Sequence, residues 1–366
     1  MEQIHLEGAS KSDSIKVLVV DDSAFMRYTI TQYLNKHPQI QVVGSAQNGE
    51  EALLMIPRLQ PDVVTLDVEM PKLDGLSTLR EIMMRFPRPV LMLSSMTKEG
   101  AVETIQALTL GAVDFITKPE QKASVNSVME DVAAKILRVA KAKVRTPLLK
   151  QQQSTVSIDS KREAGDKKIR TRQRNEPVVV IGSSTGGPRA LNMLIPALPA
   201  DLPAPVMVIQ HMPAGFTRSL AERLDSLSPL KVKEAVPGDQ LLVGQVLLAP
   251  GGFHTVFDRN EIATMNQNPP IHGVRPAVDV TMSSIVQIYG KNTLAVILTG
   301  MGHDGTNGCG LVRSAGGPVI AEDESTCVVW GMPRSVYEAG FADQIWPIHE
   351  IASAIVKTVY KMMSGL

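Results

Sequence analysis

A serine, a histidine and an aspartate, far apart in this 366-residue sequence, each follow a short aliphatic segment. The residues are Ser184, His211 and Asp304, and the segments before them span residues 178–181, 204–210 and 293–299. Such runs predict buried strands of a parallel sheet. Because the carboxyl ends of parallel strands meet at one edge, we expect the three side chains to lie together. A serine nucleophile, a histidine base and an orienting aspartate carry out acyl transfer.

A second group of polar residues follows strands in the first half of the chain. Asp21 and Asp22 follow one aliphatic run, and Asp67 ends another. Carboxylates gathered at one sheet edge repel each other unless a cation lies among them, and hard oxygen ligands suit Mg²⁺. Lys118, at a further strand end, can neutralise an anion, and Ser94 can donate a hydrogen bond to it. The pattern predicts a site for a metal ion and an anion.

Two stretches near the serine and the aspartate have other interpretations. The glycine-rich residues 182–188 are also typical of a phosphate-binding loop or of a tight turn without chemistry. Residues 300–305 fit GxGxxG after a strand, and Glu322 to Glu324 follow roughly twenty residues later, as in a dinucleotide site. That fingerprint alone is weak, and it leaves the serine and histidine at the strand ends as coincidences.

Other residues compete for the base and the acid. His303 adjoins Asp304, but neighbours on a tight loop usually point apart, so His211 is the favoured base. Asp279 is an alternative acid. His254 and His272 lie in loops rich in glycine and proline and are interpreted as rim residues.

Strands alternate with helices along both halves of the chain, which predicts an α/β fold. In the first half the predicted strands are residues 16–20, 41–44, 63–67, 90–94 and 114–119. The first helix has apolar residues at helical spacing: Phe25, Met26, Ile30 and Leu34. Five such strands predict a parallel sheet in flavodoxin-like order with helices on both faces. We expect two doubly wound domains, the second Rossmann-like.

Composition and charge narrow the class of protein. The chain is 44% hydrophobic and 20% charged, with a net charge of zero, so nothing draws it to nucleic acid. No apolar run is long enough to insert into a membrane, and the start is no signal peptide. Cys309 and Cys327 lack metal-binding spacing, which favours a reducing cytoplasm. Residues 161–174 are polar and mostly basic, typical of a solvated linker.

The first half resembles the receiver domain of bacterial response regulators. Five positions match in order and spacing: Asp21, Asp22, Asp67 in residues 66–71, Ser94, and Lys118, which Pro119 follows. The resemblance implies that Asp67 accepts a phosphoryl group from a histidine kinase, with Ser94 and Lys118 as switch residues. It also implies that Asp22, Asp67 and the backbone carbonyl of Glu69 bind Mg²⁺, with Asp21 helping through water.

The whole chain resembles the chemotaxis receptor methylesterases, in which a receiver precedes a protein-glutamate methylesterase domain. The matching stretches are residues 181–187, 209–213, 248–252, 275–279 and 298–305. The family's nucleophile falls on Ser184, its base on His211, its acid on Asp304 and its oxyanion donor on the backbone N–H of Met301. His303 departs from the Asn or small residue usual there. The implied divisions are a polar tail at residues 1–14, a receiver at 15–143, a linker at 144–176 and a catalytic domain at 177–366.

The resemblance also implies an activity and partners. The enzyme would be cytoplasmic and activated by phosphorylation, and it would hydrolyse glutamate γ-methyl esters on chemoreceptors and could deamidate glutamines, for chemotactic adaptation. Its phosphodonor would be the histidine kinase of that pathway, and its catalytic domain would need no cofactor. Two alternatives are a receiver-gated, dinucleotide-dependent oxidoreductase and a non-catalytic effector module. The absence of a helix-turn-helix pattern argues against a transcription factor.

Overall fold

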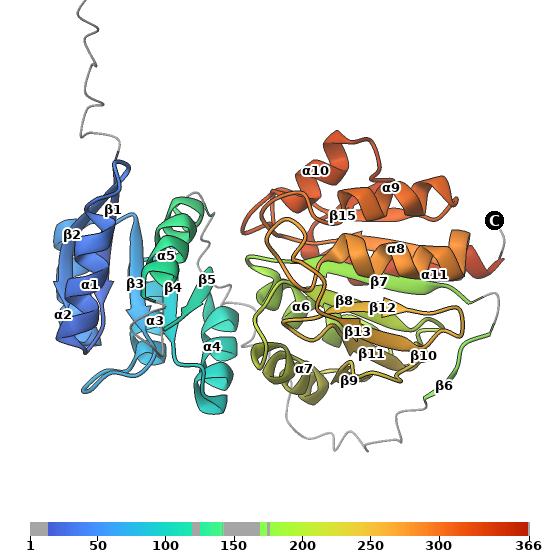
Figure 1. The fold of residues 1–366 in the computed structure, drawn as a ribbon, viewed down its shortest axis with the longest axis horizontal. Coiled ribbons are helices and arrows are strands. Elements are labelled where there is room, and N and C mark those ends of the chain that lie inside the picture. Colours follow the sequence, from blue (N-terminus) through green and yellow to red (C-terminus); the bar gives the residue numbers. More distant parts are fainter. Residues whose placement is uncertain (1–13, 119–124, 141, 143–168, 174–175, 365–366) are drawn as a thin grey trace, which may run out of the picture. The chain divides into compact units, whose positions relative to one another are not determined.

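The computed structural model describes residues 14–118, 125–140, 142, 169–173 and 176–364. They form two compact units, each built on one large parallel sheet (Figure 1). Within these described residues no helix combines the length and the apolar character that a membrane span requires.

The first unit is a five-stranded sheet in the order β2-β1-β3-β4-β5, with every pair parallel. Its strands are β1 (Ile15–Val20), β2 (Ile40–Ala46), β3 (Val63–Asp67), β4 (Val90–Ser94) and β5 (Asp114–Thr117). Along the chain these strands are followed in turn by the helices α1 (Ala24–Leu34), α2 (Gly49–Leu59), α3 (Gly75–Arg85), α4 (Lys98–Leu110) and α5 (Val125–Val139). The predicted flavodoxin-like order is confirmed.

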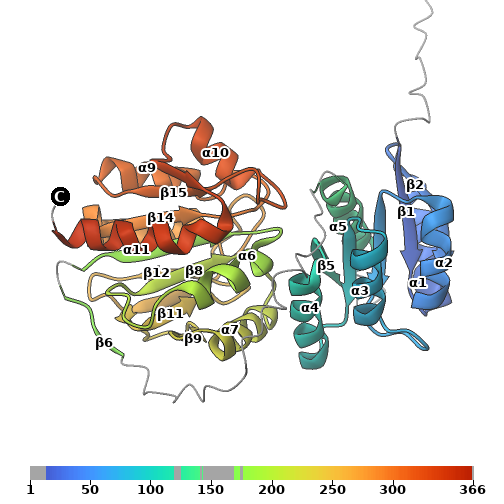
Figure 2. The same cartoon turned by 180° about the vertical axis from the view of Figure 1, so that it is seen from behind.

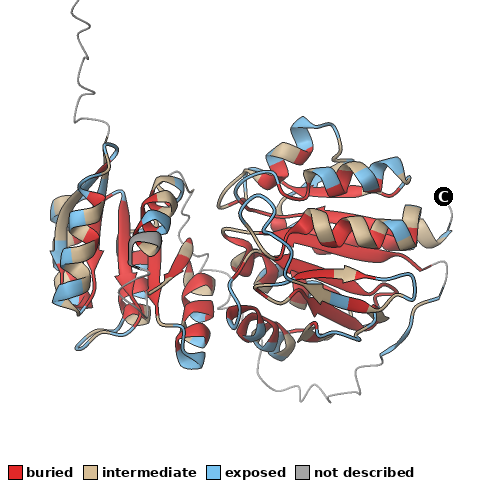
Figure 3. Cartoon of the chain, in the orientation of Figure 1, coloured by how far each residue is buried: buried red, intermediate tan, exposed pale blue. Residues whose placement is uncertain are grey.

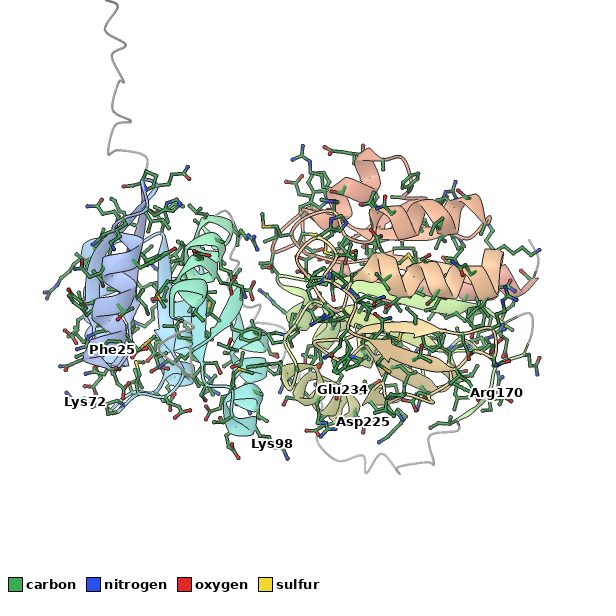
Figure 4. All side chains as sticks on the ribbon, in the orientation of Figure 1. Phe25, Lys72, Lys98, Arg170, Asp225 and Glu234 are labelled. Carbon is green, nitrogen blue, oxygen red and sulfur yellow. The ribbon has the colours of Figure 1, made fainter. Side chains whose placement is uncertain are left out.

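Helix α1 starts where its sequence provides a cap. The Ser23 hydroxyl accepts the backbone N–H of Met26 at 3.4 Å, which satisfies one free donor of the first turn. Ile30 and Leu34 are buried against the sheet, but Phe25 is 60% exposed (Figure 4). Helical spacing therefore identified the helix, and only its C-terminal apolar residues belong to the core.

The second unit is a seven-stranded parallel sheet in the order β16-β15-β14-β7-β8-β11-β9. Its strands are β7 (Val178–Ser183), β8 (Val206–Gln210), β9 (Lys231–Glu234), β11 (Gln245–Leu248), β14 (Thr293–Ile297), β15 (Val319–Glu322) and β16 (Gln344–Trp346). The α-helices are α6 (Gly187–Leu194), α7 (Phe216–Leu227), α8 (Val278–Tyr289), α9 (Thr306–Ser314), α10 (Met332–Glu338) and α11 (Ile348–Ser364). Short 3₁₀ turns at Ile195–Ala197 and Gly290–Asn292 follow α6 and α8.

The strand order creates a switch point between β7 and β14. From β7 the chain continues to β8 on one side, and it returns to β14 on the other side before adding β15 and β16. In open α/β sheets such a point leaves a crevice at the carboxyl ends of the strands. The fold is doubly wound and Rossmann-like as predicted, with β11 inserted between β8 and β9.

Helices cover both faces of this sheet. Helices α8 and α9 lie on one face, together with the hairpin of β12 (His254–Phe257) and β13 (Ala263–Asn266) (Figure 1). Helices α6, α7 and α11 lie on the other (Figure 2). The strands between are almost wholly buried (Figure 3). A Cβ added at Gly182 would lie 2.7 Å from the Val278 side chain, so glycine there lets the start of α8 pack directly on β7.

Part of the predicted linker belongs to the second unit. Strand β6 (Arg170–Thr171) pairs antiparallel with β10 (Leu242–Val243). Arg170, labelled in Figure 4, donates to the buried Glu176 carboxylate, with 2.8 Å between Nη1 and Oε2. A bidentate Arg–carboxylate pair of this kind explains why a basic, polar segment forms structure here. Residues 144–168 lie outside the described residues, and the predicted domain limits stay predictions.

Candidate active site

Asp304 follows β14 and lies against the N-terminus of α8. Its Oδ2 accepts the backbone N–H of Val278 at 2.6 Å, and its Oδ1 accepts those of Asp279 and Gly305, both at 3.0 Å. These N–H groups include the first two of α8, which have no partner within the helix. Asp304 thus caps α8, although it lies 26 residues away in the sequence.

The environment of Asp304 favours its charged form. Burial acts to raise its pKa, but the hydrogen bond and charge of His211 and the N–H groups of Asp279 and Val278 outweigh burial and lower the pKa. The positive end of the α8 dipole lies at the same place and acts in the same direction. Asp304 is therefore a permanent anion at neutral pH.

His211 follows β8, the strand next to β7. Its backbone N–H donates to the carbonyl of Ser183 at 3.1 Å, which continues the β7–β8 pairing. Its ring Nε2 lies 2.7 Å from Asp304 Oδ2. Since ionised Asp304 can only accept, Nε2 carries the hydrogen and Nδ1 has the free lone pair. The structure thus holds one tautomer, with Nδ1 as the basic nitrogen.

Ser184 is the residue next to His211 across the paired strands, because Ser183 pairs with Gln210. Gln210 connects the two turns: its Nε2 donates to the carbonyls of Ser184 and His211, both at 3.0 Å. Its Oε1 accepts the hydroxyl of the fully buried Ser183 at 2.7 Å. Ser183 is thus bonded inside the protein, whereas the half-buried Ser184 hydroxyl has no hydrogen bond within the described residues. Sequence reasoning missed Gln210, a polar residue ending a buried strand.

The loop after β14 approaches Ser184 closely. A Cβ added at Gly300 would lie 2.8 Å from Ser184 Cβ and 2.4 Å from Met332 Sδ, so only glycine fits there. The backbone N–H of Ser184 donates to the carbonyl of Thr299 at 3.1 Å. Further along this loop, the backbone N–H of Met301 has no acceptor in the described part of the chain. An unpaired N–H beside a serine is suited to stabilise an oxyanion.

The competing residues lie near the pair but are placed differently. His303 is exposed, and its ring packs edge-on against His272 at 4.2 Å between centroids. Asp279 donates its own N–H to Asp304 and is not bonded to His211. The interpretation of His254 as a rim residue is wrong. It starts β12 and is 1% exposed, with Nδ1 accepting the N–H of Ala277 at 3.2 Å and Nε2 bonding the Pro269 carbonyl at 3.2 Å.

In the first unit the predicted polar residues also meet at the carboxyl edge of the sheet. Asp67 ends β3, and its Oδ2 lies 2.6 Å from Lys118 Nζ. Asp21 Oδ2 lies 3.0 Å from the same nitrogen. Both carboxylates are buried, whereas Asp22 is exposed. Ser94 is buried at the end of β4, and its hydroxyl donates to the carbonyl of Ser95 at 3.2 Å.

Burial and charge set the protonation of this cluster. Burial raises the pKa of Asp67 to about 6, Asp21 acts in the same direction, and the charge and hydrogen bond of Lys118 act against them. Burial acts to lower the pKa of Lys118, but Asp67 and Asp21 outweigh burial and raise it. Lys118 therefore stays charged, while Asp67 titrates just below neutral pH.

The residues present fit a hard divalent cation. Carboxylate oxygens of Asp21, Asp22 and Asp67 lie within 4.8 Å of one another, and the backbone N–H of Glu69 is 3.4 Å from Asp67 Oδ1. Carboxylates and a backbone carbonyl are ligands that Mg²⁺ prefers, and a cation would offset the burial and the repulsion by Asp21 that raise the pKa of Asp67.

Comparisons with known proteins identify the family of each half of the chain. Residues 179–355 match the profile of the CheB methylesterase family, and residues 17–130 match the response regulator receiver domain. A protein-glutamate methylesterase/protein-glutamine glutaminase of Symbiobacterium thermophilum is 52% identical over 94% of this chain and 97% of its own length. The protein of the same name from Thermotoga maritima is 47% identical over 94% of this chain and 98% of its own length. This chain belongs to the protein-glutamate methylesterase/protein-glutamine glutaminase family.

In this family member the surroundings of Glu322 argue against a dinucleotide site at residues 300–305. Glu322, the first of the acidic residues considered for binding a ribose hydroxyl, is 1% exposed. Its Oε2 accepts the backbone N–H of Thr299 at 2.8 Å, and its Oε1 accepts the Thr326 hydroxyl at 2.9 Å. The carboxylate is therefore occupied beneath the loop that carries Met301. The glycines of this loop allow its close approach to Ser184.

Proposed function

We propose that this chain hydrolyses γ-methyl esters of glutamate side chains on the cytoplasmic helices of bacterial chemoreceptors, for chemotactic adaptation. The relatives named for this activity match this chain over nearly their whole length. The observation that carries the proposal is the His211–Asp304 pair beside Ser184, with Nδ1 of His211 left as a base and the Met301 N–H left as a donor.

The chemistry follows from these groups. Ser184 Oγ attacks the ester carbonyl as His211 Nδ1 takes its proton, and the Met301 N–H stabilises the oxyanion. The imidazolium returns the proton to the methoxide oxygen, which leaves as methanol. Water activated by the same nitrogen then releases glutamate and frees Ser184. With a glutamine side chain the leaving group is ammonia, so the same residues would serve deamidation.

The first unit would act as a phosphorylation switch. Asp67 would take a phosphoryl group from the histidine kinase of the pathway, while Asp21, Asp22, Asp67 and the Glu69 carbonyl would hold Mg²⁺. The ion supplies charge neutralisation for the incoming phosphoryl group. Lys118, bonded to Asp67 at 2.6 Å, would then pair with the phosphoryl oxygens, and Ser94 would donate to them. This rearrangement would raise the catalytic activity of the second unit. The enzyme would work in the cytoplasm.

The proposal is tested by methanol release from methylated receptor membranes. The wild type should release methanol, and Ser184→Ala should lower the rate by about 10⁶-fold, as expected for the nucleophile of a triad. Ser183→Ala is the matched control, because it removes a neighbouring hydroxyl bonded only to Gln210, and it should keep most of the rate. Near-normal turnover by Ser184→Ala would disprove the triad. A wild type that releases no methanol would disprove the proposed activity.

The switch is tested in the same assay with a small phosphodonor and Mg²⁺. Both added together should raise the wild-type rate about tenfold or more, which needs only about 1.4 kcal/mol of bias between two states. Asp67→Asn should keep the basal rate and lose this response. An equal response in Asp67→Asn would show that the phosphodonor acts elsewhere.

A further inference from the structure

A cluster of metal-ligating side chains adjoins the catalytic pair and has no part in the proposed mechanism. His272 Nε2 lies 3.9 Å from Asp279 Oδ2. One potential ligand atom each from His272, Asp279 and Asp304 lie within 4.8 Å of one another. His303 packs edge-on against His272, with 4.2 Å between the ring centroids. Two imidazoles and a carboxylate thus gather at the start of α8.

The backbone fixes His272 in this place. Ile271 and Val274 exchange both backbone hydrogen bonds, at 3.2 and 3.0 Å, around a two-residue turn. His272 and Gly273 in the turn have φ of 53° and 78°, the conformation of a type I′ turn. The buried His254 holds the flanking loop through Pro269 and Ala277. His272 is therefore presented to α8 by a defined turn.

Asp279 has an oxygen that the protein does not use. Its Oδ1 accepts the backbone N–H of Gly308 at 2.8 Å. Its Oδ2 is buried and has no hydrogen-bond donor in the described part of the chain. Only 11% of the side chain is exposed, so solvent offers little in its place. A buried acceptor without a partner is costly. His272 Nε2 lies 3.9 Å from this oxygen, beyond hydrogen-bonding distance.

Asp304 is a neighbour of this cluster and not a free ligand. Its two oxygens accept three backbone N–H groups and the His211 ring, which fills the four lone-pair positions of a carboxylate. A cation bound at Asp279 would still lie close enough to act on Asp304 by charge.

We propose that His272 and Asp279, with His303 as third ligand after a side-chain rotation, bind a divalent transition metal ion such as zinc. Imidazole nitrogen with one carboxylate suits zinc, cobalt or nickel, whereas Mg²⁺ prefers oxygen ligands alone. The bound cation weakens the negative field of Asp304, and this field stabilises the imidazolium of His211 during turnover. The metal therefore inhibits the enzyme. The inhibitory role rests on the proposed function, whereas the metal binding does not.

Binding is tested first, without turnover. Co²⁺ is added to the full chain, purified without a histidine tag, in excess Mg²⁺ to saturate the acidic site around Asp67. The expected result is a visible absorption band of nitrogen-ligated Co²⁺ that Zn²⁺ displaces. His272→Asn should lose the band and keep the fold, because Asn is favoured in a type I′ turn.

The matched control is His349→Asn, which removes an exposed histidine that also faces a carboxylate, Glu350, at 3.7 Å. It should leave the band unchanged. Loss of the band in both variants, or in neither, overturns the site.

Inhibition is tested by titrating Zn²⁺ into the methanol-release assay. His272→Asn should keep the metal-free rate and raise the half-inhibitory Zn²⁺ concentration at least ~10-fold, the lower range for losing a metal-site contact. Equal inhibition of His272→Asn and wild type overturns the inhibitory role. A Co²⁺ band in a protein without methylesterase activity would disprove the proposed function and leave the metal site standing.

Discussion

Asp67 and Asp304 are buried carboxylates at the same kind of place, the carboxyl edge of a parallel sheet, and their pKa values shift in opposite directions. The pKa of Asp67 rises to about 6, and that of Asp304 falls below its usual value. Both lose solvation on burial. The difference lies in the donors: Asp304 accepts three backbone N–H groups and His211, whereas Asp67 has Lys118, one long N–H contact at 3.4 Å and the repulsion of Asp21.

This difference matches what the proposed role of each site requires. A residue that orients a base should never lose its charge, so backbone donors fixed by α8 are the suitable partners. A residue that accepts a phosphoryl group has to exchange its partners during each cycle. A single lysine and a metal ion can leave or move, which fixed N–H groups cannot do. The carboxyl edge of a parallel sheet thus holds a carboxylate of constant charge in one unit and one of changeable charge in the other.

The largest predicted effect comes from replacing the Asp304 carboxylate, which accepts all of these donors. Asp304→Asn places an amide where the imidazole N–H needs an acceptor, so His211 adopts the wrong tautomer and methanol release should fall by about 10⁴-fold. Circular dichroism should show an intact fold. Asp279→Asn, at the helix start that Asp304 caps, is the control and should retain the metal-free rate. The reverse result would make Asp279 the acid.

A smaller effect sharpens the contrast through the pH dependence of Asp67. Its carboxylate must be ionised to attack the phosphodonor, and with a pKa of about 6 the ionised fraction drops about tenfold between pH 7 and pH 5. Phosphoryl incorporation at limiting Mg²⁺ should fall by that factor. Saturating Mg²⁺ lowers the pKa and should shift the curve to lower pH, which separates Asp67 from titration of the donor. Coincident curves would contradict the assignment.

The smallest effect concerns Glu322, a third buried carboxylate at a strand end. Its carboxylate accepts the Thr299 N–H and the Thr326 hydroxyl, and burial raises its pKa to about 7. Between about pH 4.5 and 7 the folded state therefore holds more protons than the unfolded state, so Glu322 lowers stability as pH rises.

Glu322→Gln should remove that contribution. Both tryptophans, Trp330 and Trp346, lie in the second unit, so tryptophan fluorescence of the full chain reports its melting alone. The wild-type melting temperature should fall by a few degrees more than that of Glu322→Gln between pH 5.5 and pH 8. Equal shifts in the two proteins would mean that other groups satisfy the buried carboxylate.

The strands and the residues that end them could be read from the sequence because their signals are local. Aliphatic runs of four to six residues mark β3, β4, β7 and β8, and a polar residue at the end of each reaches the sheet edge by topology alone. The flavodoxin-like order followed from the alternation of elements.

Features that depend on distant contacts were not visible in the sequence. Periodicity along α1 could not reveal that Phe25 faces solvent, and the loop-like surroundings of His254 did not reveal that it is buried. The capping of α8 by Asp304 joins segments 26 residues apart, and Gln210 acts through side-chain bonds that no spacing rule encodes. The pKa contrast depends on these contacts, so only the structure could provide it.

The central claim, that Ser184 is activated by His211 against a permanently charged Asp304, is tested most directly by finding where a serine-directed fluorophosphonate attaches. Peptide mass spectrometry of the labelled full chain should place the adduct on Ser184, and labelling should be far slower in Asp304→Asn. An adduct on Ser183, or labelling at the same rate in Asp304→Asn, would contradict the account.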